Sequence, residues 1–206
     1  MISDKHRDRF WKIKELYDTA EADLKNIGRD NQALVVTGIN QCRYVGQHLL
    51  RAMTATDEKV IDEELDAALR HTQRAIYDTN DSGIQYYVSK IDEIRNEHFP
   101  TVDFSQIVDS YGDIVKEIEE AKTLTATTAE SLENRENRSQ FYQKSREHVE
   151  KLQKYYSLLN AYRPDLVRAV QKDNRDKLRT WAGVALALFS LLGLLLTLAS
   201  CLNFSG

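Results

Sequence analysis

Few side chains in this chain of 206 residues are spaced for recognisable chemistry. Histidine is the side chain best suited to acid–base work near neutral pH, but the five histidines are scattered. His148 falls on an apolar helical stripe, where we expect a hydrogen-bonded packing histidine. The sequence has no glycine-rich phosphate loop, zinc-binding His-Glu helix motif, nucleophile elbow or EF-hand loop. We therefore expect no cofactor and no metal site.

The two cysteines point to a reducing compartment rather than to a reactive site. Cys42 lies in a helical pattern and Cys201 in an uncharged C-terminal stretch, so neither a disulfide framework nor a thiolate metal site is expected. The net charge of −4 at pH 7 argues against broad nucleic-acid binding. A local basic face is still compatible with that charge.

Helix-forming residues dominate the composition, and apolar residues recur in alternating steps of three and four. That period is typical of amphipathic helices with one buried face. The apolar stripes predict helices over about 10–28, 31–55, 57–97, 107–132 and 141–162.

Local signals predict where these helices begin and end. Gly28 is a natural end for the first helix. Thr56 or Asp57 is suited to cap the third, and Pro100 ends it because the residue before proline avoids the helical region. Pro164 should kink or interrupt the chain before a last helix.

The segment Asn80–Gly83 has the composition of a turn, yet the apolar stripe resumes beyond it in almost the same register. We interpret 57–97 as one helix, with a break at this segment as the alternative. The fold class that follows is all-α: an antiparallel bundle of long helices with a C-terminal single transmembrane helix. Residues 1–170 form the predicted cytosolic bundle, 171–180 a basic juxtamembrane segment and 181–203 a transmembrane tail anchor.

The tail-anchor prediction depends on the uncharged stretch from Trp181 to Leu202. About 22 residues at roughly 1.5 Å each match a hydrocarbon core of about 30 Å, whereas a buried core helix is the alternative. Trp181 suits the headgroup layer, and basic residues on the N-terminal side alone predict a cytoplasmic N-terminal domain on a single-pass protein of the cell membrane. These interface residues are Lys172, Arg175, Lys177 and Arg179.

Small and hydroxyl-bearing residues of the same stretch follow steps of three and four, which gathers them on one helix face. In lipid, close approach at small residues and hydroxyl hydrogen bonds drive helix association. The pattern predicts a homo-oligomer held together by Gly183, Ala187, Ser190, Gly193, Thr197 and Ser200.

Two adjacent segments, "NQCRYVGQHLLRAM" and "DAALRHTQRAIYDTNDSGIQYYVSKIDEI", carry a family resemblance. Together they resemble HEPN-like proteins, all-helical modules common in bacterial toxin–antitoxin and antiviral defence loci. The resemblance covers about 32–98, and it extends to a group of such proteins that end in a membrane helix.

Ribonucleases of this superfamily carry an arginine, then four to six residues, then a histidine. Arg43 and His48 meet that spacing, so the resemblance implies a catalytic role for them in a dimeric ribonuclease. Five residues at about 100° each place the two side chains roughly 140° apart on a helix. A compact pair therefore requires an irregular helix or a residue from a partner subunit.

The sequence favours an interaction or signalling module that works through membrane and protein contacts, as a sensor, adaptor or membrane-acting effector in bacterial defence. The protein partner is not indicated by any motif. One alternative is a membrane-tethered HEPN-type ribonuclease that uses Arg43 and His48, and only this alternative implies RNA as a partner. Another is a structural membrane tether for a partner complex.

Overall fold

The computed structural model describes the backbone of residues 4–32, 35–131 and 138–203, and the side chains of 5–32, 35–126, 141 and 143–193. This part of the chain is helical and contains no strand, as the sequence predicts. A π-helical turn η1 (Glu93–His98) and a 3₁₀ turn η2 (Phe104–Gln106) lie between α3 and α4. The α-helices are α1 (Asp4–Asn31), α2 (Val36–Thr54), α3 (Glu58–Asp92), α4 (Tyr111–Ser131), α5 (Arg138–Ala161) and α6 (Arg163–Asn203).

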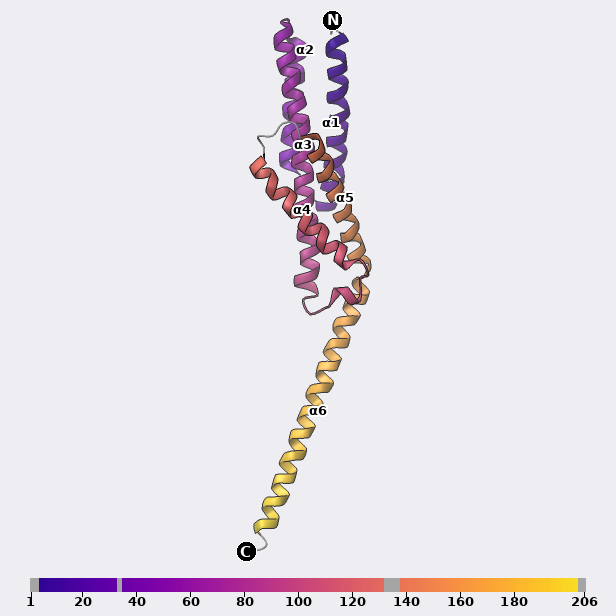
Figure 1. The fold of residues 1–206 in the computed structure, drawn as a ribbon, viewed down its shortest axis with the longest axis vertical. Helices are drawn as coiled ribbons and strands as arrows, with labels where there is room; N and C mark the ends of the chain where they lie inside the picture. The colour runs from indigo at the N-terminus through magenta and orange to yellow at the C-terminus, as the bar shows by residue number, and fades with distance from the viewer. Residues whose placement is uncertain (1–3, 33–34, 132–137, 204–206) are drawn as a thin grey trace.

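The helices form a bundle around α3, and α6 leaves that bundle to end far from it (Figure 1). Helices α1, α2 and α5 all pack on α3, while α4 packs mainly on α5. The helical bundle is therefore confirmed.

Helix α3 is the predicted single helix. The Asp57 carboxylate caps its start by accepting a hydrogen bond from the Lys59 backbone N–H at 2.9 Å. The helix then continues into η1, and Phe99 ends the helical run before Pro100. Near its start α3 buries about one residue per turn, whereas in its middle, where α5 packs on it as well as α1 and α2, it buries pairs of adjacent residues. The buried residues are Leu65, Ala68, Thr72, Ala75, Ile76, Thr79, Asn80, Gly83, Ile84, Tyr87 and Ile91.

Gly83 explains the small residues of the turn-like segment. A Cβ atom at this position would lie 2.7 Å from Cδ1 of Ile27 on α1 and 3.2 Å from Cγ2 of Val149 on α5. The glycine thus lets α1 and α5 approach α3 closely, and the helix continues through it despite its low helix propensity.

Buried hydrogen bonding explains the polar residues of the same segment. Asn80 is only 1% exposed and donates to Asp23 of α1 at 3.3 Å. Arg146 of α5 lies 3.4 Å from the same carboxylate. Burial raises the pKa of Asp23, and the Arg146 charge and the Asn80 hydrogen bond act against that rise. The polar residues thus join α1, α3 and α5 instead of forming a turn.

Asp30 makes a second link between these three helices. Its carboxylate accepts hydrogen bonds from the Tyr87 hydroxyl at 2.6 Å and from the Gln153 amide at 2.7 Å, and its carbonyl accepts one from Tyr86 at 2.7 Å. Burial alone raises the pKa of Asp30, but hydrogen bonds from Tyr87, Gln153 and Arg29 outweigh burial and leave it below its usual range.

Several helix ends differ from the sequence-based expectation. Helix α1 continues past Gly28 to Asn31, and Gln32, with φ of 51°, takes the left-handed conformation that ends it. Helix α2 begins at Val36 rather than near residue 31. Pro164 lies in the first turn of α6, where a missing N–H costs nothing, so the predicted interruption falls at Tyr162.

The predicted transmembrane helix is wrong for the part of the chain that the structure describes, since no helix there is long and apolar enough to cross a membrane. Helix α6 carries charges as far as Arg179, and its described side chains end at Gly193. The same finding overturns the expectation of a single-pass protein of the cell membrane with a cytoplasmic N-terminal domain.

Gly83→Leu should destabilise the bundle by about 1–3 kcal/mol, because the new side chain has to displace Ile27 and Val149 from a close-packed site. Urea unfolding followed by circular dichroism measures this change. Gly112→Leu is the matched control, because a Cβ there meets no atom within 4 Å. Equal stability of the two variants would contradict the close approach at Gly83.

Asp30→Asn should lower stability at pH 7 but have less effect at pH 3. A carboxyl whose pKa falls on folding stabilises the fold above its unfolded pKa of about 3.9, and that contribution is lost as the pH drops through the folded value. Urea unfolding of both proteins from pH 7 to pH 3 measures the difference. A difference that does not change with pH would rule out an ionised Asp30 as the stabilising group.

Candidate functional site

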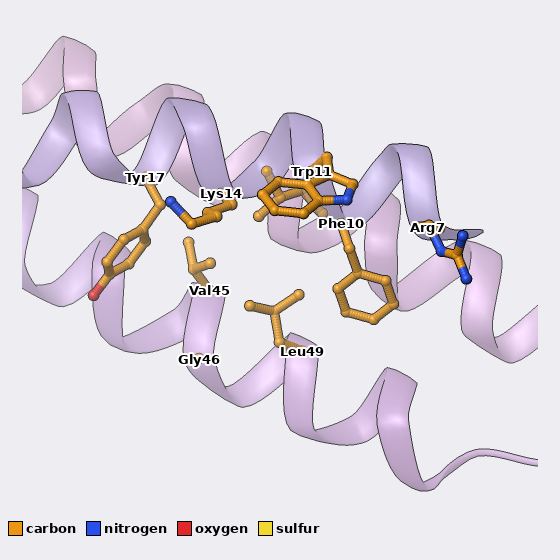
Figure 2. Close-up of a pocket in the computed structure, with 9 residues that line it drawn as sticks. Arg7, Phe10, Trp11, Lys14, Tyr17, Val45, Gly46 and Leu49 are labelled. Atoms are coloured by element: carbon orange, nitrogen blue, oxygen red, sulfur yellow. The ribbon is translucent and has the colours of Figure 1, made fainter. Parts of the chain in front are cut away.

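An open apolar groove lies between α1 and α2, which both pack on α3 but diverge from each other (Figure 2). Its volume is about 780 Å³. The buried side chains of Ile13 and Val45 form its floor and belong to a core cluster that includes Leu65 of α3. The lining consists of Arg7, Phe10, Trp11, Ile13, Lys14, Tyr17, Val45, Gly46 and Leu49.

Helical spacing places these residues along the groove. On α1, Arg7, Phe10, Lys14 and Tyr17 follow steps of three and four and so share one face, and Trp11 and Ile13 lie on either side of that row. Trp11 is 58% exposed, which is high for so large an apolar side chain. On the α2 side a Cβ at Gly46 would meet nothing within 4 Å, so no atom of the described chain covers the groove there.

The charged residues in the groove lining are basic. Arg7 and Lys14 contribute to it, and no carboxylate does. Lys14 forms an ion pair with Asp18 at 2.6 Å. Asp18 lies one helical turn further along α1 and is not part of the groove lining. Helix α2, which forms the other wall, contains Arg43 and Arg51 and no acidic residue.

A second candidate site lies between α2 and α3, where two histidine rings stack. The rings of His48 and His71 lie 5.1 Å apart between centroids and 16° from parallel. Nδ1 of His48 is 2.6 Å from Oε2 of Glu64. Nδ1 of His71 is 2.7 Å from Oε1 of Gln41, whose amide in turn donates to Asp78 at 3.1 Å.

These hydrogen bonds assign the tautomers of both rings. A carboxylate only accepts, so Asp78 orients the Gln41 amide with its nitrogen toward Asp78 and its oxygen toward His71. His71 therefore donates through Nδ1, and His48 donates through Nδ1 to Glu64. Each ring keeps Nε2 for another partner, because no residue with a described side chain hydrogen-bonds to either of these atoms.

The two histidines differ in their electrostatic surroundings. Burial lowers the pKa of His71, and the nearby charges of His48, Arg74 and Arg70 lower it further. His71 is therefore neutral near pH 7. His48 instead lies with Nδ1 2.6 Å from the Glu64 carboxylate.

The structure does not bring Arg43 and His48 together. Arg43 is exposed and donates to Asn40 at 3.2 Å, whereas His48 faces Glu64 on α3. Glu64, Gln41 and His71, which contact the stacked histidine pair or belong to it, were not predicted from the sequence.

A signal for the missed residues lies in the short turn that joins α2 and α3. Residues equidistant from the turn of a helical hairpin face each other. His48 and Glu64 each lie eight residues from Thr56, and Gln41 and His71 each lie fifteen residues from it.

His148 has the packing role that the sequence predicts. Its Nδ1 contacts the buried carboxylate of Glu117, which also lies 3.0 Å from Nζ of Lys151. The ring thus joins α4 to α5. Among the described residues, no group of three or more histidines, cysteines or carboxylates is placed to hold a metal ion.

The residues predicted on the C-terminal stretch lie along α6. Those predicted as interface residues, Lys172, Arg175, Lys177, Arg179 and Trp181, are all exposed. Of the predicted association face, Gly183, Ala187, Ser190 and Gly193 are exposed, while the side chains of Thr197 and Ser200 lie outside those the structure describes. The Ser190 hydroxyl donates to Leu186 of its own helix at 2.9 Å. Self-association through this face stays a prediction.

Comparison with models of protein families, with curated proteins and with solved structures finds no match for this chain. The HEPN-like resemblance therefore stays a prediction. The groove and the stacked histidine pair are the two candidate sites.

Replacing Gln41 by Leu should remove the tautomer preference of His71, because the acceptor at Nδ1 is lost. Long-range ¹H–¹⁵N correlation spectra at pH 7 should show a neutral, Nδ1-protonated His71 in the wild type and a mixture of tautomers in Gln41→Leu. Gln47→Leu on the exposed face of α2 should leave the His71 signals unchanged. An Nε2-protonated His71 in the wild type would contradict the assignment.

Proposed function

We propose that this protein is a helical interaction module whose α1–α2 groove binds an amphipathic helix of a partner protein. This proposal is based on the open apolar groove between α1 and α2, which both pack on α3 (Figure 2). An amphipathic helix that lays its apolar face into such a groove is a recurring mode of protein recognition.

The length of the groove is suited to binding a short helix of a partner. The lining of α1 extends from Arg7 to Tyr17, which is about 15 Å or three helical turns at 1.5 Å per residue. That length accommodates anchors at positions i, i+3, i+4 and i+7 of the bound helix. Exposed Leu50 and Met53 continue the α2 stripe that begins at Gly46 and Leu49, so the apolar surface extends beyond the groove.

The residue types indicate where the binding energy lies. Tryptophan and tyrosine are enriched among the residues that dominate binding, and Trp11 and Tyr17 both line the groove. Arg7 and Lys14 favour a partner helix with acidic residues beside its apolar stripe. The HEPN-like resemblance is consistent with such a module acting as a sensor or adaptor in bacterial defence.

A titration with designed helical peptides tests this function. Trp181→Phe leaves Trp11 as the single tryptophan, so its emission reports on the groove. A peptide with leucines at i, i+3, i+4 and i+7 and flanking glutamates should bind and shift the Trp11 emission to shorter wavelength. The same peptide with flanking lysines should bind at least about tenfold more weakly, a difference of about 1.4 kcal/mol.

Gly46→Gln should block the groove without unfolding the protein, since its new side chain projects into open space. Peptide affinity should fall at least about tenfold, or 1.4 kcal/mol. Gly112→Gln, at an equally open position on α4, is the control and should bind as the wild type does. Equal affinity for both peptides together with unchanged binding by Gly46→Gln would refute the proposed function.

A further inference from the structure

We infer that the partner helix is a long one with a seven-residue apolar repeat, and that charge fixes its direction on the protein. This inference rests on the groove function proposed above and extends the binding surface beyond the groove. An open hollow of about 490 Å³ lies further along the same two helices. Its lining includes the apolar positions Leu24, Gly28, Val35 and Ile39 and the charged residues Glu21 and Lys25.

The groove and this second hollow share one row of residues on α1. The row extends from Arg7 to Gly28, which is about 31 Å, or roughly six helical turns, at 1.5 Å per residue. Its spacing alternates between three and four, so the row stays on one face of the helix. In chain order the residues are Arg7, Phe10, Lys14, Tyr17, Glu21, Leu24 and Gly28.

Helix α2 and its N-cap residue carry a matching row, whose two halves meet at Cys42. Cys42 is half-buried and packs against the core cluster that contains Ala20 and Ala75. Burial raises the pKa of the Cys42 thiol, and the charge of Glu21 on α1 raises it further, so Glu21 lies close to Cys42. The groove and the second hollow are therefore one surface, the α1–α2 seam. The row on this side is Val35, Ile39, Cys42, Gly46 and Leu49.

The spacing of both rows is that of a coiled-coil seam. Alternating steps of three and four give a seven-residue repeat, and each side chain of a third helix can insert between residues of the two rows. Helices α1 and α2 pack far more extensively on α3 than on each other. A helix laid along the seam contacts both of them and completes a four-helix arrangement with α3. The occupant that fits is a helix of roughly three heptads.

Positive charge lies at one end of the seam only. Arg7 and Lys14 line the groove end, where no carboxylate belongs to the lining. The second hollow contributes Glu21 and Lys25, which form an ion pair at 3.1 Å and add no net charge. A partner helix with acidic residues in one half should therefore lie with that half beside Arg7 and Lys14, so charge complementarity sets its direction.

The first experiment tests the length of the surface with the full chain carrying Trp181→Phe. Peptides of 14 and 28 residues, with leucines at positions a and d and flanking glutamates, are titrated at concentrations at which both are monomeric. The longer peptide should bind at least about tenfold more tightly. Ile39→Gln in the second hollow should abolish this gain and leave the affinity of the shorter peptide unchanged. Val36→Gln, at an exposed position outside both linings, is the matched control and should retain the gain.

The second experiment tests the direction of the bound helix by energy transfer from Trp11 to a dansyl group at the peptide N-terminus. Two 28-residue peptides carry glutamates beside the stripe in the N-terminal half or in the C-terminal half, with glutamines elsewhere. Transfer should be at least about twofold more efficient for the first peptide, because its label then lies near Trp11 rather than about 31 Å along the seam.

Binding of the shorter peptide with no gain for the longer one would overturn this inference and leave the proposed function intact, so the two failures are distinguishable. Equal energy transfer for the two 28-residue peptides would also overturn it, since charge would not set the direction. Sedimentation of the protein alone as a dimer that Gly46→Gln and Ile39→Gln both dissociate would identify a second copy of this chain as the occupant and overturn it as well.

Discussion

Burial of α3 along almost its entire length is the constraint on which the other helices depend. The helix places Leu65, Ile84, Tyr87 and Ile91 in the core, and each fully buried side chain of this size contributes about 1.5–3 kcal/mol. The apolar side chains on the different sides of α3 have to be covered by other helices, and α1, α2 and α5 cover them. The close approach of α1 and α5 at Gly83 and the hydrogen bonds of Asn80 fix where along α3 this covering occurs.

Both candidate sites follow from this arrangement. Helices α1 and α2 each pack on α3, where Ile13, Val45 and Leu65 share one core cluster, and the surface between the two helices is left open as the groove. The short turn between α2 and α3 sets the register of that hairpin, and the register places His48 opposite Glu64 and Gln41 opposite His71. One supporting helix therefore positions an apolar surface on one flank of α2 and a polar pair on the other.

Much of the helix layout was accessible from the sequence because it depends on local chemistry. The apolar stripes, the Asp57 cap and the break near Pro164 all act within a few residues along the chain. The single helix through Gly83 was also accessible, since the stripe resumes in register. The end of α1 was not, because the left-handed residue is Gln32 and a nearby glycine offered a better local candidate.

The candidate site was harder to predict because it joins residues that are distant in the sequence. The spacing of Arg43 and His48 is a property of one helix, whereas the partners of His48 come from α3. Hydropathy also led to a wrong prediction at the C-terminal stretch, since no helix in the part of the chain that the structure describes is long and apolar enough to cross a membrane. Spacing within one helix says little about contacts until the pairing of helices is known.

Residue-resolved amide hydrogen exchange tests the central role of α3 most directly. An uninterrupted helix covered on several sides opens only with the whole bundle, so its amides from Leu65 to Ile91 should exchange slowest and at similar rates. This slow group should include Asp81, Ser82 and Gly83. Exchange of these three amides orders of magnitude faster than both flanks would divide α3 into two helices and contradict the account.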